Sequence, residues 1–178
     1  MEAPTPFDKS VDRPTAFLSY AREDRTFARR LADALATKGS DVRADWKLTS
    51  GEQYAKSLRS FILMADAFIF VISPDSVASP QCKSEIAIAV EHKKRILPVS
   101  YRDHGDDDRL DSAIRTPQWT LLTVADDFEL GAHSLSEALR TDFDLMDRHA
   151  RLLLDADEWA ENNKNRGYLL QGEELATA

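Results

Sequence analysis

The chain has 178 residues, of which 43% are hydrophobic and 30% charged, and its formal net charge is −8 at pH 7. This size predicts one compact domain with some residues in addition, and it is large enough for a buried core. The negative charge argues against partners that are nucleic acids or anionic membranes. The only cysteine, Cys82, cannot form an internal disulfide, which is typical of a cytoplasmic protein.

No targeting segment is visible in the sequence. The N-terminus lacks the basic and apolar regions of a signal peptide, and residues 1–13 are polar and proline-containing, which predicts a flexible arm. The longest apolar run, residues 67–72, is too short to span a bilayer. We therefore expect a soluble protein.

Short apolar runs then alternate with amphipathic segments, which predicts strands and helices in turn. The predicted strands are residues 15–20, 41–46, 67–73, 95–103 and 118–124, and the predicted helices are 22–39, a segment through Leu58, Phe61, Ile62 and Ala65, and 79–95. The third strand is apolar on both faces, as in the centre of a parallel sheet. Right-handed crossovers predict a flavodoxin-like, three-layer α/β fold with a central five-stranded parallel sheet. Residues 74–80 are interpreted as a break within which the next helix begins, and 104–117 as an acidic loop.

A different pattern begins near Ser134. Ser134 and Glu137 have the spacing of a capping box, which predicts the start of a helix. Apolar residues then recur for two heptads, too few to indicate a coiled coil, so the helix either docks on its own domain or faces a partner. The sequence stops in what resembles a further helix, which predicts a fragment of a longer protein. We expect a domain at 14–130 and a C-terminal helical extension or connector at 131–178.

Several kinds of site are not indicated. The chain has no glycine-rich phosphate loop, its four histidines are scattered, and the acidic run 104–108 is interpreted as solvated, so neither a metal nor a cofactor is expected. No nucleophile elbow marks a serine, and Cys82 is interpreted as a core residue. A receiver-like phosphoacceptor is disfavoured because no acidic cluster ends the first strand.

The segment "SPQCKSEIAIAVEHKKR", residues 79–95, carries the one unusual carboxylate. Ser79 is a good N-cap and Pro80 fits the first helical position, so the apolar stripe consists of Cys82, Ile86, Ala89 and Val90. Glu85 lies at the margin of this stripe and beyond the reach of the helix dipole. The helix begins at the sheet edge where ligands bind in such folds. Spacing alone leaves two alternatives open for Glu85, a solvated face or a pocket wall.

Several of these motifs together resemble a Toll/interleukin receptor (TIR) domain. "AFLSYAREDRTFARRLADAL" is similar to its first strand and helix, "DVRADW" with "KLTSGEQ" to its second strand and BB loop, and "AFIFVISPDSVASPQCKSEI" to its third strand and S-x-x-C-x-x-E segment. The resemblance covers about residues 14–125, and it is strongest to bacterial members that precede a sensor module.

The resemblance implies an NAD hydrolase. Family members with the S-x-x-C-x-x-E motif, here Ser79, Cys82 and Glu85, cleave the nicotinamide–ribose bond of NAD to give nicotinamide and ADP-ribose or a cyclic product. Glu85 would be the catalytic residue, facing the positive charge that develops on the ribose, and NAD would be substrate rather than cofactor. The implied setting is bacterial antiviral or immune-type signalling, activated by self-association of TIR domains. The alternative is a non-enzymatic TIR scaffold for homotypic assembly.

The same resemblance implies a substrate-binding set in two further segments. Phe17, Ser19, Tyr20 and Arg22 would form the nicotinamide and phosphate side, although the family's two adjacent basic residues are here Ala21 and Arg22, and a solvated Arg22 is the alternative. Asp45 and Trp46 would line the site, with simple packing as the alternative for Trp46. Lys47, Leu48 and Gly51 belong to the BB-like loop. Gln81 replaces an aromatic residue found in some members.

Overall fold

The computed structural model describes residues 13–44, 52–103, 105, 110–123, 127–141, 143 and 159, and for 52–57 the backbone alone. The chain divides into two compact units, Met1–Leu139 and Arg140–Ala178. The first unit contains the sheet and all the described parts of the candidate site. Within the described residues, no helix combines the length and apolar character needed to cross a membrane.

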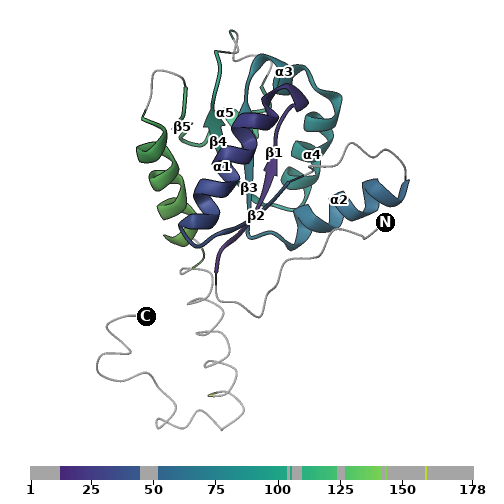
Figure 1. Ribbon diagram of the computed structural model, residues 1–178. Helices are drawn as coiled ribbons and strands as arrows, with labels where there is room; N and C mark the ends of the chain where they lie inside the picture. Colours follow the sequence, from purple (N-terminus) through teal and green to yellow (C-terminus); the bar gives the residue numbers. More distant parts are fainter. Residues whose placement is uncertain are drawn as a thin grey trace. The chain divides into compact units, whose positions relative to one another are not determined.

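Five parallel strands form one sheet in the order β2-β1-β3-β4-β5 (Figure 1). They are β1 Thr15–Ser19, β2 Asp41–Ala44, β3 Ala67–Ile72, β4 Arg95–Ser100 and β5 Thr120–Leu121. Every residue of β3 is buried, and β3 pairs with β1 on one side and β4 on the other. The predicted flavodoxin-like parallel sheet is therefore confirmed, with the most apolar run at its centre.

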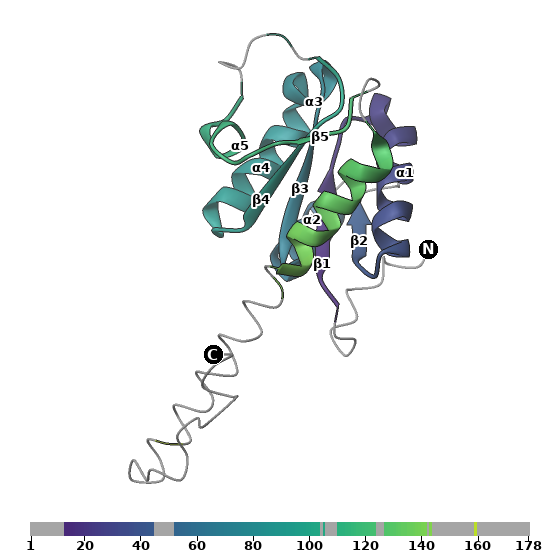
Figure 2. The same ribbon diagram turned by 90° about the vertical axis from the view of Figure 1, so that its left-hand side faces the viewer.

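Helices cover both faces of this sheet, so the predicted three layers are also confirmed. They are η1 Arg22–Asp24, α1 Arg25–Thr37, α2 Glu52–Met64, α3 Pro74–Ala78, α4 Pro80–Glu91, α5 Ser112–Arg115 and a helix at residues 128–141. Figure 2 shows the sheet between α1 on one side and α4 with α5 on the other. α1 ends where the chain reverses at Gly39, whose φ of 93° is a conformation that favours glycine.

The two faces have separate hydrophobic cores. On one face, Phe27, Leu31 and Leu35 of α1 pack with Leu135 and Leu139 of the C-terminal helix against alternate residues of β1, β3 and β4. On the other face, side chains of α2, α4 and α5 surround three phenylalanines of β1 and β3. The buried members of this core are Phe17, Ile62, Ala65, Phe68, Phe70, Ile72, Val77, Cys82, Ile86, Ala89, Leu110 and Ile114. Strand residues alternate between the two cores because successive side chains point to opposite faces.

The helix expected to begin at Ser134 begins six residues earlier, so that prediction is wrong. Asp127 provides the cap instead, because its Oδ1 accepts hydrogen bonds from the backbone N–H groups of Glu129 (3.0 Å) and Leu130 (3.2 Å). Ser134 lies inside the helix and donates to the carbonyl of Leu130. Burial of Leu135 and Leu139 in the α1 core shows that the helix docks on its own unit as far as residue 139.

Two segments interpreted as irregular contain short helices. Residues 74–78, expected to be a break, form α3, because Ser73 and Ser76 make a reciprocal capping box and Pro74 occupies the first position. Within the expected acidic loop, Ser112–Arg115 form α5, and the Asp111 side chain accepts from the N–H of Ala113. Caps of this kind satisfy the unpaired N–H groups of even a single helical turn.

Candidate functional site

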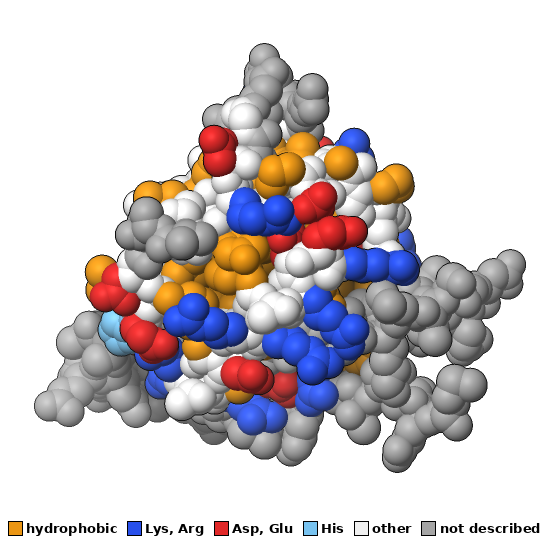
Figure 3. Space-filling view, turned by 45° about the horizontal axis from the view of Figure 1, so that its top comes forward, with side chains coloured by type: hydrophobic (Ala, Val, Ile, Leu, Met, Phe, Trp, Pro, Cys, Tyr) orange, Lys and Arg blue, Asp and Glu red, His pale blue; other side chains and the backbone are white. Residues whose placement is uncertain are grey.

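A cleft opens at the point where the strand order reverses. In the strand order, β2 lies next to β1 on one side and β3 lies next to β1 on the other. The connection that follows β1 therefore runs toward β2, and the connection that follows β3 runs the opposite way, toward β4. In open α/β sheets ligands bind in the crevice at this point, outside the carboxyl ends of the strands. Here the cleft has a volume of about 510 Å³, within the range of sites for small molecules. Figure 3 looks onto this edge and shows acidic and basic side chains interspersed around hydrophobic ones.

The first wall of the cleft is the end of β1 and the turn after it. Phe17 contributes from the strand, where its ring stacks on Phe68 with centroids 5.9 Å apart. The turn is closed by a hydrogen bond from the N–H of Asp24 to the carbonyl of Ala21 (2.9 Å), which forms η1. Tyr20 and Arg22 line the cleft from this turn, and the Arg22 side chain is exposed. The arrangement leaves a guanidinium available at the mouth of the cleft.

The second wall is formed by α3 and the first turns of α4. The predicted start of α4 is confirmed: the Ser79 side chain accepts a hydrogen bond from the N–H of Cys82 (3.3 Å), and Pro80 is the first helical residue. Ser79, Gln81 and Glu85 all line the cleft. The cap therefore fixes the register that brings residues 81 and 85, one helical turn apart, onto the cleft wall.

Glu85 is only 3% exposed, so the solvated alternative for this carboxylate is wrong. Its Oε1 accepts a hydrogen bond from the Gln81 side-chain amide at 3.1 Å. The buried face of α4 consists of Cys82, Glu85, Ile86 and Ala89. Val90, predicted on the stripe, is 43% exposed, because it lies about 90° around the axis from the middle of that face.

Cys82 and Ser19 lie beneath the cleft rather than in its wall, because both are buried and neither is a lining residue. Burial raises the pKa of the Cys82 thiol to about 11, and the nearby Glu85 carboxylate adds to this effect. The side chains of Ser79 and Ser19 lower the pKa of this thiol, but by less than burial raises it. The thiol is therefore neutral near pH 7, which excludes a thiolate nucleophile here.

The charge of the cleft is mixed. Glu23, Asp75 and Glu85 contribute carboxylates to the lining, and Arg22 contributes the cation. In the part of the chain that the structure describes, no three His, Cys, Asp or Glu side chains are grouped so as to hold a metal ion. The described cleft thus offers one buried carboxylate, one exposed guanidinium and an aromatic wall.

The structure brings together five of the predicted site residues in the cleft wall, namely Phe17, Tyr20, Arg22, Ser79 and Glu85. Asp45, Trp46, Lys47, Leu48 and Gly51 lie outside the described residues. The sequence interpretation missed the lining residues Leu18, Ala21, Glu23, Asp75, Ala78, Pro80 and Gln81. Glu23 and Asp75 could have been predicted, because each follows the end of a parallel strand within a few residues, and ligands bind at that edge of such sheets.

Comparisons with known proteins agree with this fold. The sequence profile of the TIR domain family matches residues 16–135. The TIR domain of the Toll-related receptor TRR-2 from Hydra magnipapillata is 21% identical, with 70% of this chain and 97% of that chain covered and a TM-score of 0.58. The TIR domains in the activated Roq1 resistosome that recognises the effector XopQ are 20% identical, with 71% and 99% covered and a TM-score of 0.55. No curated protein matches the chain significantly in sequence.

Proposed function

We propose, from the premise that this chain belongs to the TIR domain family, that it is an NAD glycohydrolase which cleaves the nicotinamide–ribose bond. The observation that carries the proposal is Glu85, a carboxylate buried to 3% exposure in the wall of a cleft at the ligand-binding edge of the sheet. A buried carboxylate costs folding free energy unless it is well paired. A catalytic role would explain why a carboxylate occupies this buried position despite that cost.

The chemistry requires one negative charge at one place. As the nicotinamide–ribose bond breaks, positive charge develops on the anomeric carbon and its ring oxygen, as in glycoside hydrolysis. Nicotinamide leaves as a neutral pyridine, so its departure needs no proton donor. Glu85 would stabilise the developing cation, and its low exposure strengthens this interaction because little water screens it. Gln81, by donating to Oε1, would hold the carboxylate in one orientation.

The rest of the substrate would extend along the first wall. Tyr20 and Phe17 present aromatic surface, and Arg22 is an exposed guanidinium at the same wall. A guanidinium can bind a phosphate through two parallel hydrogen bonds, so Arg22 is the natural partner for the diphosphate of NAD. Water would then attack the ribosyl cation to give ADP-ribose, or the adenine base would do so to give a cyclic product.

We infer further that activity depends on self-association of the domain, in a cytoplasmic signalling pathway of the immune or antiviral type. The cleft lies at one edge of the sheet, and the solved structures that this chain resembles include TIR domains within an activated resistosome. A neighbouring copy would complete such a cleft. The second candidate function, a TIR scaffold without catalysis, would use the same homotypic contacts.

The decisive experiment measures nicotinamide release from NAD by protein clustered through a fused oligomerising domain, and by unfused protein over a concentration series. Glu85→Gln keeps the shape of the side chain and removes its charge, so release should fall by at least about a hundredfold. Glu91→Gln, an exposed carboxylate on the same helix, is the matched control and should retain activity. If clustered wild-type protein releases no nicotinamide, the hydrolase proposal is wrong and the scaffold remains.

A further inference from the structure

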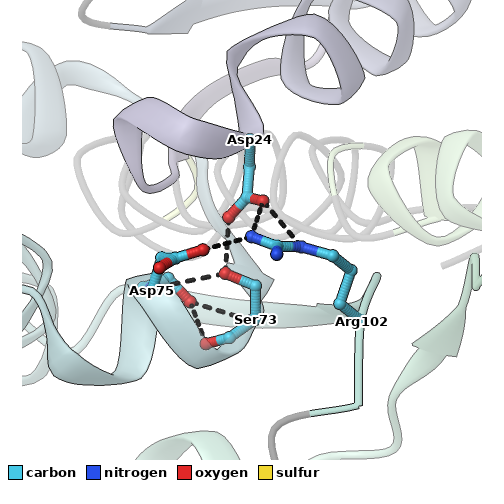
Figure 4. A network of polar contacts seen from close by, with 5 residues as sticks. Asp24, Ser73, Asp75 and Arg102 are labelled. Atoms are coloured by element: carbon cyan, nitrogen blue, oxygen red, sulfur yellow. Dashed lines mark hydrogen bonds and ion pairs between the residues drawn. The ribbon is translucent and has the colours of Figure 1, made fainter.

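Arg102 ties together the chain segments that follow β1, β3 and β4 (Figure 4). It follows β4, and its Nε and Nη2 donate to Oδ1 of Asp24 at 3.0 and 2.5 Å. The same Nη2 also donates to Oδ2 of Asp75 in the first turn of α3. One guanidinium therefore contacts carboxylates from two segments that lie far apart in the sequence.

Asp24 is a buried carboxylate whose two oxygens are both used. Oδ1 accepts from Arg102, and Oδ2 accepts from the hydroxyl of Ser73 at 2.5 Å. Ser73 is also the N-cap of α3, so its hydroxyl links the cap of that helix to the turn after β1. Full pairing of this kind is what a buried charge needs, because removing one partner leaves the other uncompensated.

These contacts join the two walls of the cleft. Asp24 ends η1, directly after the lining residues Arg22 and Glu23, whereas Asp75 belongs to the opposite wall. Arg102 itself is not a lining residue, and 39% of its side chain is exposed. It therefore reaches both walls from outside the cleft.

The contacts also settle the charge of one wall. The hydrogen bonds that Arg102 donates to Asp75 and Asp24 raise the pKa of its guanidinium, which therefore stays charged. Without this cation, the negative charge of Asp75 would be uncompensated on a cleft whose lining already includes the carboxylates of Glu23 and Glu85. The added negative charge would repel an anionic diphosphate.

We propose that Arg102 is a positioning residue of the cleft: by bridging Asp24 and Asp75 it fixes the two walls relative to each other and neutralises the Asp75 carboxylate, so that the cleft accepts a dinucleotide diphosphate. The substrate class rests on the proposed function, whereas the fixing of the walls does not. Each part has its own measurement.

The test compares Arg102→Gln with Arg59→Gln. Arg59 is similarly exposed, at 43%, and pairs with the exposed Glu91, so the control removes the same charge from an ordinary surface ion pair. In clustered protein, Arg102→Gln should raise KM for NAD roughly tenfold with a smaller change in kcat, because binding of the diphosphate is weakened. In the same variant, hydrogen exchange of the Asp24 backbone amide, which is hydrogen-bonded to the Ala21 carbonyl, should become faster. Arg59→Gln should change neither quantity.

Two further variants separate positioning from general stability. Arg102→Lys keeps the charge without the forked geometry of the guanidinium. Its KM should therefore lie between those of Arg102→Gln and the wild type, and its Asp24 amide should regain less of the wild-type protection from exchange. Adding Asp75→Asn to Arg102→Gln removes the unpaired carboxylate and should bring KM back toward the wild-type value. If Arg102→Gln does not fold, Arg102→Lys and Asp75→Asn carry the same comparison.

Failure of the hydrolase proposal and failure of the positioning role of Arg102 give different results in these experiments. If clustered wild-type protein releases no nicotinamide, the hydrolase is refuted, and amide exchange alone decides whether Arg102 fixes the walls. A variant of Arg102 with lowered thermal stability but unchanged KM and unchanged Asp24 exchange would overturn the positioning role. Equal behaviour of Arg102→Gln and Arg59→Gln would overturn it as well.

Discussion

The buried thiol of Cys82 should make the stability of this fold sensitive to alkaline pH. Burial raises the pKa of Cys82 from its ordinary value of 9.0 to about 11, and negative charge on Glu85 and Asp24 acts in the same direction. The side chains of Ser79 and Ser19 oppose this increase only in part. The folded chain therefore holds the thiol proton more tightly than the unfolded chain does.

The size of the effect follows from linkage. Each pH unit by which the folded pKa exceeds the unfolded value corresponds to about 1.36 kcal/mol. A difference of about two pH units therefore gives about 3 kcal/mol. Because the folded pKa is raised, this contribution is fully present below about pH 9 and is lost as the pH rises through about 11.

Urea unfolding of the wild-type protein and of Cys82→Ala between pH 7.5 and 11 measures this contribution. Lysines and tyrosines titrate in the same range, so the informative quantity is the difference between the two proteins, in which their contributions cancel. The stability advantage of the wild type over Cys82→Ala should shrink steadily above pH 9. Parallel stability curves for the two proteins across this range would refute the reasoning.

Three substitutions test other parts of the fold and site. Gly131→Ala should destabilise the protein by about 1–3 kcal/mol, since a Cβ there would lie 2.3 Å from Cδ2 of Leu122, and thermal unfolding measures it. Ser79→Ala should cost about 1 kcal/mol in urea unfolding through loss of the α4 cap, whereas the exposed Ser84→Ala should cost much less. Arg22→Ala should raise KM for NAD in clustered protein by roughly tenfold with kcat little changed; an unchanged KM would remove Arg22 from the diphosphate site.

Local sequence patterns were sufficient to predict the central strand of the sheet and the start of α4. The continuous apolar run of β3 identified the central strand, because only a strand buried on both faces has that pattern. Ser79 and Pro80 identified the first turn of α4, because capping depends on residues that are local in the sequence. Both properties are determined by neighbours along the chain.

The burial of Glu85 and the role of Arg102 could not be predicted in this way. Spacing placed Glu85 at the edge of a stripe, and its exclusion from water depends on how the segments after β1 and β3 pack around it. Arg102 contacts Asp24, which lies 78 positions away in the sequence, and no periodic pattern connects them. The resemblance to TIR domains indicated Glu85, but the contacts around this carboxylate depend on the tertiary fold.

The burial of Glu85 also implies that the residue best for stability at position 85 differs from the residue that the proposed activity needs. A carboxylate at 3% exposure is held in place of a well-packed apolar side chain that would stabilise the fold more. A library of random variants selected only for heat resistance should therefore accumulate neutral residues at position 85, in a protein that folds better and lacks the carboxylate on which the proposed activity depends.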